Sequence, residues 1–169
     1  MARPQTGEHA PFHQAYIALT QGDDIATIIS NHSNSITDFI GNLPDSKADY
    51  AYAPGKWTVK QVIQHLIDAE RIMTYRALRF ARKDETPLAG FDQDEYAAQA
   101  PTSARSLQSL KDEFALIRQS GNIFFSGLTP EELTQTGIAN NNPVTVNALA
   151  YIILGHALHH IAVLKEKYQ

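Results

Sequence analysis

Four long stretches of this chain repeat apolar residues at spacings of three and four, the period of one face of an α-helix. In the first stretch Ile25, Ile28, Ile29 and Ile36 follow this spacing. No stretch shows a convincing alternation of apolar and polar residues, the pattern of a half-buried strand. We therefore predict an all-α four-helix bundle without a sheet, with long helices over residues 24–43, 58–82, 103–126 and 145–167.

Turn and capping residues indicate where these helices begin and end. Thr58 lies three residues before Gln61, the spacing of a capping box that satisfies backbone donors at a helix start. Shorter helical pieces are predicted over residues 12–19 and 129–132, and a loop over residues 137–142. The connection between the second and third long helices, residues 84–101, is rich in Gly, Pro and acidic residues. Loops of that length often form lids or binding loops, so we expect it to shape a substrate pocket.

Composition narrows the environment and the chemistry. The net charge is only -4 and no basic run stands out, so nucleic acid is not the expected partner. The absence of cysteine excludes disulfides, thiolate metal ligands and a mechanism based on the protein's own thiol. No signal peptide is recognisable, and the longest apolar stretch, residues 147–158, is too short and broken to span a bilayer. We expect a soluble cytoplasmic protein in which residues 1–169 form one domain, with residues 1–15 as a mobile N-terminal segment.

Three of the seven histidines fall in the fourth predicted helix, at His156, His159 and His160. Residues four apart share a helix face, and two imidazoles at that spacing can bind one ion. On a helical wheel His156 and His160 lie within the apolar stripe, whereas His159 lies toward its edge. Burying two unpartnered imidazoles would cost on the order of 1–3 kcal/mol each, a cost that a shared metal ion removes. The pattern therefore favours a metal pair, although such a spacing also arises by chance.

A third ligand is expected from a facing helix. His65 lies on the shoulder of the second helix's apolar stripe, and His32 lies on the stripe of the first. A single histidine on an apolar face is more often a hydrogen-bonded core residue. We interpret His32 in that way, and the same interpretation applies to His65 taken alone. His9 and His13 are interpreted as surface residues. Three neutral histidines leave a fourth coordination position open, as in catalytic sites, and suit zinc or nickel better than calcium or magnesium.

Other features of the sequence carry weaker predictions. Asp68 is one turn from His65 and could orient a metal-bound imidazole, and Glu70 could act as a general base. Most of the charged residues of the second helix, its arginines among them, are interpreted as a solvated face that forms ion pairs. The fourth helix carries a second apolar line opposite its histidines, which suggests a homodimer interface: Ala150, Leu154, Leu158 and Ile161.

Several segments together resemble a known family. They are residues 52–58, 68–71, 75–82, 90–94 and 155–160, together with His65. With these segments the chain resembles the DinB-like superfamily of bacterial four-helix bundles over nearly its whole length. The resemblance implies a divalent metal held by one histidine of the second helix and two of the fourth, which correspond to His65, His156 and His160. The family includes S-transferases that use low-molecular-weight thiols such as bacillithiol, a mycothiol-dependent isomerase, and proteins named putative metal-dependent hydrolases.

Two functions follow as hypotheses. In the first, the chain is a metal-dependent enzyme of the S-transferase or hydrolase type. The metal then activates a thiolate or water for a small-molecule substrate, with a low-molecular-weight thiol as a possible co-substrate. In the second, the chain is a non-catalytic, metal-binding or ligand-binding dimer that serves as a stress-response accessory. A pocket beside an open metal position favours the enzyme, whereas a metal sealed under side chains favours the second hypothesis.

Overall fold

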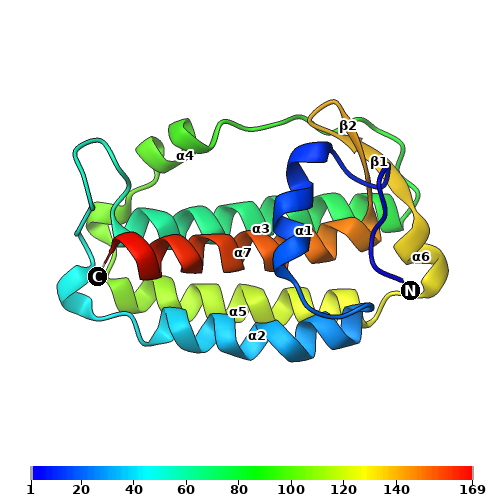
Figure 1. The fold of residues 1–169 in the computed structure, drawn as a ribbon. Coiled ribbons are helices and arrows are strands. Elements are labelled where there is room, and N and C mark those ends of the chain that lie inside the picture. Colours follow the sequence, from blue (N-terminus) through cyan, green and yellow to red (C-terminus); the bar gives the residue numbers. More distant parts are fainter. Residues whose placement is uncertain (1, 169) are drawn as a thin grey trace.

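The structure is a computed structural model that describes residues 2–168. Its four long helices are α2 (Ile25–Gly41), α3 (Val59–Ala81), α5 (Leu107–Ser126) and α7 (Val146–Lys167). Shorter helices are α1 (Gln14–Leu19), α4 (Gln93–Gln99) and α6 (Pro130–Thr134), with single 3-10 turns at Pro11–His13, Asp45–Lys47 and Thr102–Ala104. The long helices pack as a four-helix bundle (Figure 1), so the predicted fold class is confirmed.

Polar side chains cap the long helices at their N-termini. The capping box predicted for α3 is present, because the Thr58 hydroxyl accepts from the Gln61 backbone and the Gln61 side chain accepts from the Thr58 backbone. Helix α5 begins at Leu107, four residues later than predicted. Ser106 is its N-cap, and the residues before that cap form a 3-10 turn and an extended residue. The start of each of the four long helices is therefore set by one side chain that satisfies a backbone donor.

The order of the helices around the bundle explains the long connection between α3 and α5. Around the ring the contacting pairs are α2 with α5, α5 with α3, α3 with α7 and α7 with α2. Figure 1 shows that α3 and α5 run in the same direction. The chain must therefore return along the whole bundle between them, and residues 82–106, with α4 among them, make this return over the outside of α3.

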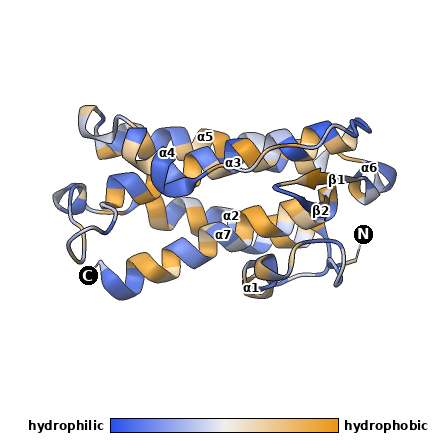
Figure 2. Cartoon of the chain, turned by 90° about the horizontal axis from the view of Figure 1, so that it is seen from above, coloured by the Kyte–Doolittle hydropathy of each residue, from blue (hydrophilic) through white to orange (hydrophobic). Residues whose placement is uncertain are grey.

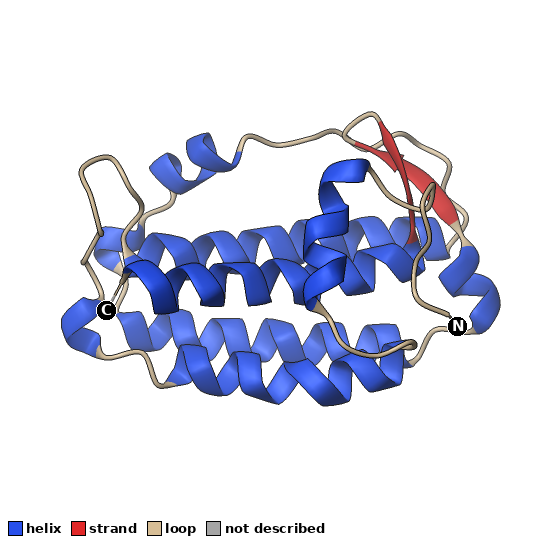
Figure 3. Ribbon diagram, viewed as in Figure 1, coloured by secondary structure: helices blue, strands red, loops and turns tan. Residues whose placement is uncertain are grey.

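A small antiparallel hairpin lies where a loop was predicted. Strands β1 (Thr136–Ala139) and β2 (Asn142–Thr145) pair with Thr136 opposite Thr145 and Ala139 opposite Asn142 (Figure 3). Asn140 and Asn141 form the two-residue turn with φ of 50° and 60°, left-handed values that asparagine tolerates. The prediction of a bundle without any sheet was therefore wrong at this point. The hairpin also holds the return connection, because Leu88 hydrogen-bonds to the backbone of β1 and its turn.

Helix α7 is the central helix of the protein, and hydrophobic residues recur along it in Figure 2. It contacts α1, α2 and α3, and three residues of its second apolar line, Ala150, Leu154 and Ile161, are buried within the single chain. This line therefore does not require a second subunit, and homodimerisation stays a prediction. By length and composition alone α7 could cross a membrane, contrary to the prediction for this stretch. However, 72% of its most apolar window is buried inside the protein, as in a core helix.

The N-terminal segment packs against the end of the bundle. The Arg3 guanidinium donates hydrogen bonds to the carbonyl groups of Thr20 and Gly22, and the Asn147 side chain donates to the Ala2 carbonyl group. The segment also carries α1, which crosses α7 (Figure 1). This crossing is close because α7 has a glycine at the contact. A Cβ atom on Gly155 would lie 2.0 Å from the carbonyl oxygen of Tyr16.

Gly155→Ala is therefore expected to destabilise the protein by about 1–3 kcal/mol, because the added methyl group must push α1 away from α7. Urea unfolding of the two proteins measures the difference. Gly41→Ala is the matched control, because Gly41 is also helical and nothing lies within 4 Å of its built Cβ atom. Equal stability of Gly155→Ala and the wild type would contradict the close crossing.

Candidate metal centre

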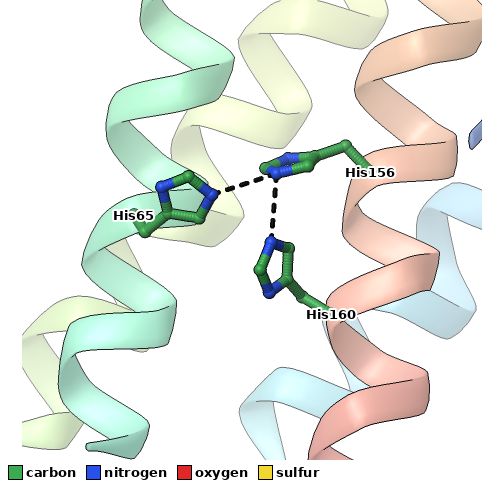
Figure 4. Close-up of side chains that lie close together, drawn as sticks. All are labelled: His65, His156 and His160. Carbon is green, nitrogen blue, oxygen red and sulfur yellow. Dashed lines mark hydrogen bonds between the residues drawn. The ribbon is translucent and has the colours of Figure 1, made fainter. Parts of the chain in front are cut away.

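Three histidines from two helices meet between α3 and α7. His65 comes from α3, and His156 and His160 come from successive turns of α7 (Figure 4). The Nε2 atom of His156 lies 3.0 Å from Nε2 of His65 and 3.1 Å from Nε2 of His160. One nitrogen from each ring can be chosen so that all three lie within 4.8 Å of one another. Ligand atoms at 2.0–2.1 Å from a tetrahedral ion are about 3.3 Å apart, so the rings need little movement to share one ion.

The environment of the three rings keeps them neutral. His65 and His156 are buried, and His160 is partly exposed. Burial lowers the pKa of His65 to about 4, and Asp94 opposes this shift. Burial, followed by the charges of His65 and His159, lowers the pKa of His160 to about 3. The pKa of His156 is lowered well below 6.5 by burial and then by its histidine neighbours. Near pH 7 all three rings thus offer lone pairs, the state in which imidazole binds a metal.

The donor set fits a divalent ion better than it fits hydrogen bonding alone. The Nε2 atom of His156 faces two other Nε2 atoms, yet a neutral imidazole nitrogen can offer only one proton or one lone pair. The three rings can therefore satisfy one another only if two donors share the lone pair of His156 Nε2 or two acceptors share its proton. A cation at the point where the rings converge would accept all three lone pairs. Three imidazole nitrogens without a carboxylate suit zinc, nickel or another borderline ion.

Aromatic side chains hold the rings from two sides. The Trp57 ring lies 4.8 Å from that of His65 and stacks on that of His160 at 6.5 Å. Tyr16 of α1 contacts the edge of His156 at 5.4 Å between ring centroids. His159 is exposed and packs beside Tyr16, outside the group of three, as the helical wheel predicted.

Two of the other predicted polar roles do not fit the structure. Glu70 lies in the bundle core, where it forms a buried ion pair with Arg118 of α5. Glu70 is therefore not placed to act as the general base that the sequence left open. Asp68 accepts a hydrogen bond from Gln64, and no hydrogen bond joins it to His65 among the described residues. It therefore does not orient the imidazole ring.

The remaining histidines divide between expected and unexpected positions. Nε2 of His32 accepts a hydrogen bond from the Gln21 backbone at 2.7 Å, as expected for a core histidine. His9 and His13 were predicted at the surface, but His9 is buried and His13 is partly buried. His13 also borders the cavity described next. The apolar pattern around these two residues is too short to reveal that position.

A cavity of about 300 Å³ opens beside the histidines. His65 and His156 form part of its wall, and residues of α1, α3, α7 and the β-hairpin form most of the rest. Gly90, Phe91 and Gln93 of the return connection close another side, so that connection shapes the cavity, as predicted. A volume of this size is at the lower end of small-molecule sites. The three-histidine centre is thus open to a pocket rather than sealed under side chains.

A second, more open groove reaches the histidines from the opposite end. His159, His160 and Trp57 line it, together with Asp94 of α4. The side chain of Asp94 is the carboxylate whose charge acts on His65. Sequence reasoning did not assign Asp94 a role, because only the path of the return connection brings α4 back over the centre. Its position in a segment of the family resemblance was the one available signal.

Known proteins share the sequence features of this chain. The sequence profile of the DinB superfamily matches residues 29–164. The chain belongs to the DinB superfamily. A relative from Oceanobacillus iheyensis, named "Putative metal-dependent hydrolase", is 27% identical over 139 residues, which cover 81% of this chain and 79% of the relative. A relative of the same name from Bacillus pumilus is 28% identical over 127 residues, 73% of this chain and 71% of the relative.

Solved structures from Bacillus subtilis share the fold. YfiT, described as "a probable metal-dependent hydrolase with an unusual four-helix bundle topology", superposes with a TM-score of 0.71 and 17% identity. The match covers 96% of this chain and 89% of YfiT. The DinB-like protein YjoA matches with a TM-score of 0.58 and 16% identity, over 83% of this chain and 85% of YjoA. The bundle in which α3 and α5 run parallel therefore has the same fold as these two proteins.

Proposed function

We propose that this protein is a divalent-metal-dependent hydrolase whose ion is held by His65, His156 and His160. The observation that carries the proposal is that two of these rings line a cavity of about 300 Å³. The names of the relatives support the same class of reaction. A divalent ion at this centre, zinc or nickel by its donor set, would lower the pKa of water and polarise a substrate oxygen.

The chain's own residues have separate tasks in this proposal. The three imidazoles are neutral near pH 7 and are held in place by Trp57 and Tyr16, so the donor set is ready without loss of protons. The apolar walls of the cavity exclude bulk water from the reacting bond. Asp94 is the carboxylate in the lining of the groove whose charge acts on His65, and we assign it the task of accepting the proton of the attacking water.

Asp94→Asn is expected to lower kcat for metal-dependent ester hydrolysis by roughly a hundredfold, because a positioned general base contributes about that much. The assay follows 4-nitrophenyl esters of short acids with zinc-loaded or nickel-loaded protein, and chelation of the metal should abolish the activity. Metal content of Asp94→Asn should stay at the wild-type value. Glu95→Gln is the matched control, since Glu95 is the next residue on α4 and lines a different pocket. Unchanged kcat in Asp94→Asn would remove the assigned proton acceptor.

A thiol S-transferase is the second candidate, and the two openings beside the centre favour it. The cavity reaches His65 and His156, and the groove reaches His160, so two substrates could approach from opposite sides. The same assay separates the two enzymes. Product formation that requires an added low-molecular-weight thiol supports the transferase, and product formation in its absence supports the hydrolase. A protein that binds metal but converts no substrate under either condition would fit the accessory role. The cytoplasmic location stays a prediction.

A further inference from the structure

Arg76 is the one formally charged residue in the lining of the cavity. The other polar lining residues are neutral amides, a tyrosine and the neutral histidines, and no Asp or Glu takes part. Among residues 2–168, no carboxylate lies within ion-pair distance of the Arg76 side chain. The other arginines of α3 differ in this respect: Arg71, Arg79 and Arg82 pair with Glu113, Asp84 and Glu132. The solvated, paired face that was predicted for most charged residues of this helix therefore does not include Arg76.

The guanidinium of Arg76 also has spare hydrogen-bonding capacity. One Nη2 donates to the Ala89 carbonyl oxygen at 2.8 Å, which fixes the side chain against the return connection. An arginine carries five N–H donors, and the described residues supply no second acceptor for this one. The side chain is half-buried and borders both the cavity and a shallow surface pocket beside Leu88 and Tyr96. It therefore lies at the mouth of the cavity.

A second polar group near this end lacks a partner. Nδ1 of His13 is buried and has no hydrogen-bond partner among the described residues. Burial lowers the pKa of His13 to about 4, with smaller effects from His9 and Arg76, so the ring adds no second charge near pH 7. The cavity thus offers one cation among neutral polar groups, one of which has an unpartnered nitrogen, and this is suited to a ligand with a single negative charge.

The positions of the lining residues on α3 give the orientation of a ligand. His65, Ala69, Met73 and Arg76 follow one face of the helix at spacings of four, four and three. His65 and Arg76 are eleven positions apart in the sequence. This corresponds to a rise of about 16 Å along the helix. The long side chain of Arg76 shortens this span, because helical side chains lean toward the N-terminus. Between the two ends the wall is mostly apolar, with Phe91, Leu149 and Ile152 among its residues.

We propose that the cavity binds an elongated small carboxylate, with its anionic end on Arg76 and its apolar body directed toward His65 and His156. This inference rests on the proposed hydrolase function for the identity of the site, and it names the substrate class. A carboxylate fits better than a phosphate dianion, because it carries one negative charge and Arg76 is the one cation in the lining. The hydrolysed bond then lies at the uncharged end of the substrate.

Binding of 4-phenylbutanoate to the metal-free protein tests the inference by titration calorimetry. The wild type should bind the acid more tightly than its neutral amide, 4-phenylbutanamide. Arg76→Gln should weaken binding of the acid roughly 10- to 100-fold, the range of a lost charge-assisted hydrogen bond, and leave binding of the amide unchanged. Arg76→Lys, which keeps the charge without the fork, should show a smaller loss. Arg82→Gln is the control, because it removes the same charge at the C-cap of α3, outside the cavity.

Equal affinity for the acid and the amide, or wild-type affinity in Arg76→Gln, would overturn the inference. Tighter binding of phenyl phosphate than of 4-phenylbutanoate would overturn the choice of a carboxylate. Should Arg76→Gln fail to fold, the acid and amide on the wild type and on Arg76→Lys still decide the question. Because the protein is metal-free, failure of this test is distinguishable from failure of the hydrolase. A protein that binds the acid through Arg76 but hydrolyses no ester contradicts only the proposed reaction.

Discussion

Replacing His65, His156 or His160 by alanine is expected to abolish stoichiometric binding of zinc or nickel. Each replacement leaves two imidazoles, and a catalytic site of this type needs three protein ligands to hold its ion against exchange with water. The metal content after dialysis should fall from about one ion per chain to less than about a tenth of that value. Elemental analysis of the purified variants measures the ratio, and unfolding curves of the metal-free proteins show whether each variant still folds.

Two further histidines serve as controls in the same experiment. His159→Ala should retain most of the metal, because this ring is exposed and lies outside the group of three. His32→Ala should also retain it, because His32 is occupied by the backbone of Gln21, although loss of that hydrogen bond lowers stability. Loss of metal in His159→Ala with retention in His160→Ala would show that His159 is the partner of His156. Retention of metal in His65→Ala, His156→Ala and His160→Ala would show that these histidines do not form a metal centre.

The apolar pattern predicted the four long helices and the pairing of His156 with His160, whereas the choice of His65 as the third residue also depended on the family resemblance. His65, His156 and His160 lie on or beside apolar stripes, and stripes must face one another in a bundle. The start of α3 was also predictable, because its N-cap residue Thr58 lies in a capping box that can be recognised from the local sequence. The hairpin was not predicted, because each strand has only four residues and Pro143 interrupts the second. A pattern of period two cannot be recognised over so short a distance.

Roles that depend on the packing of distant segments could not be predicted. No local feature of the sequence distinguishes Arg76 from the exposed arginines of α3. The cavity beside Arg76 forms only because the hairpin and α1 pack near it. Asp94 lies in the groove beside the centre because α3 and α5 are parallel and their connection must cross the bundle. Glu70 has the spacing of a solvated residue, yet its helix face meets α5 and not the solvent. Charge on a helix thus acquires its role from the neighbour it meets.

The ion pair of Glu70 with Arg118 is expected to have the largest effect on folding. Both side chains are almost fully buried, at 3% and 4% exposure, in the contact between α3 and α5. Burial raises the pKa of Glu70, and Arg118 opposes this by favouring the charged carboxylate. Arg118→Ala or Glu70→Ala alone should therefore destabilise the protein by about 3–5 kcal/mol, because the remaining charge is left buried without a partner. Urea unfolding at pH 7 measures the loss.

The double variant Glu70→Leu with Arg118→Met separates the cost of an unpaired charge from the value of the pair itself. Well-packed apolar residues of similar volume often replace a buried ion pair with little loss, so the double variant should be much more stable than either single alanine variant. Arg71→Ala is the control on the same two helices, since its pair with Glu113 is half-exposed and should contribute less than about 1 kcal/mol. A double variant as unstable as the single ones would mean that the pair stabilises the contact between α3 and α5 directly. Wild-type activity in a stable double variant would show in addition that Glu70 takes no part in the chemistry.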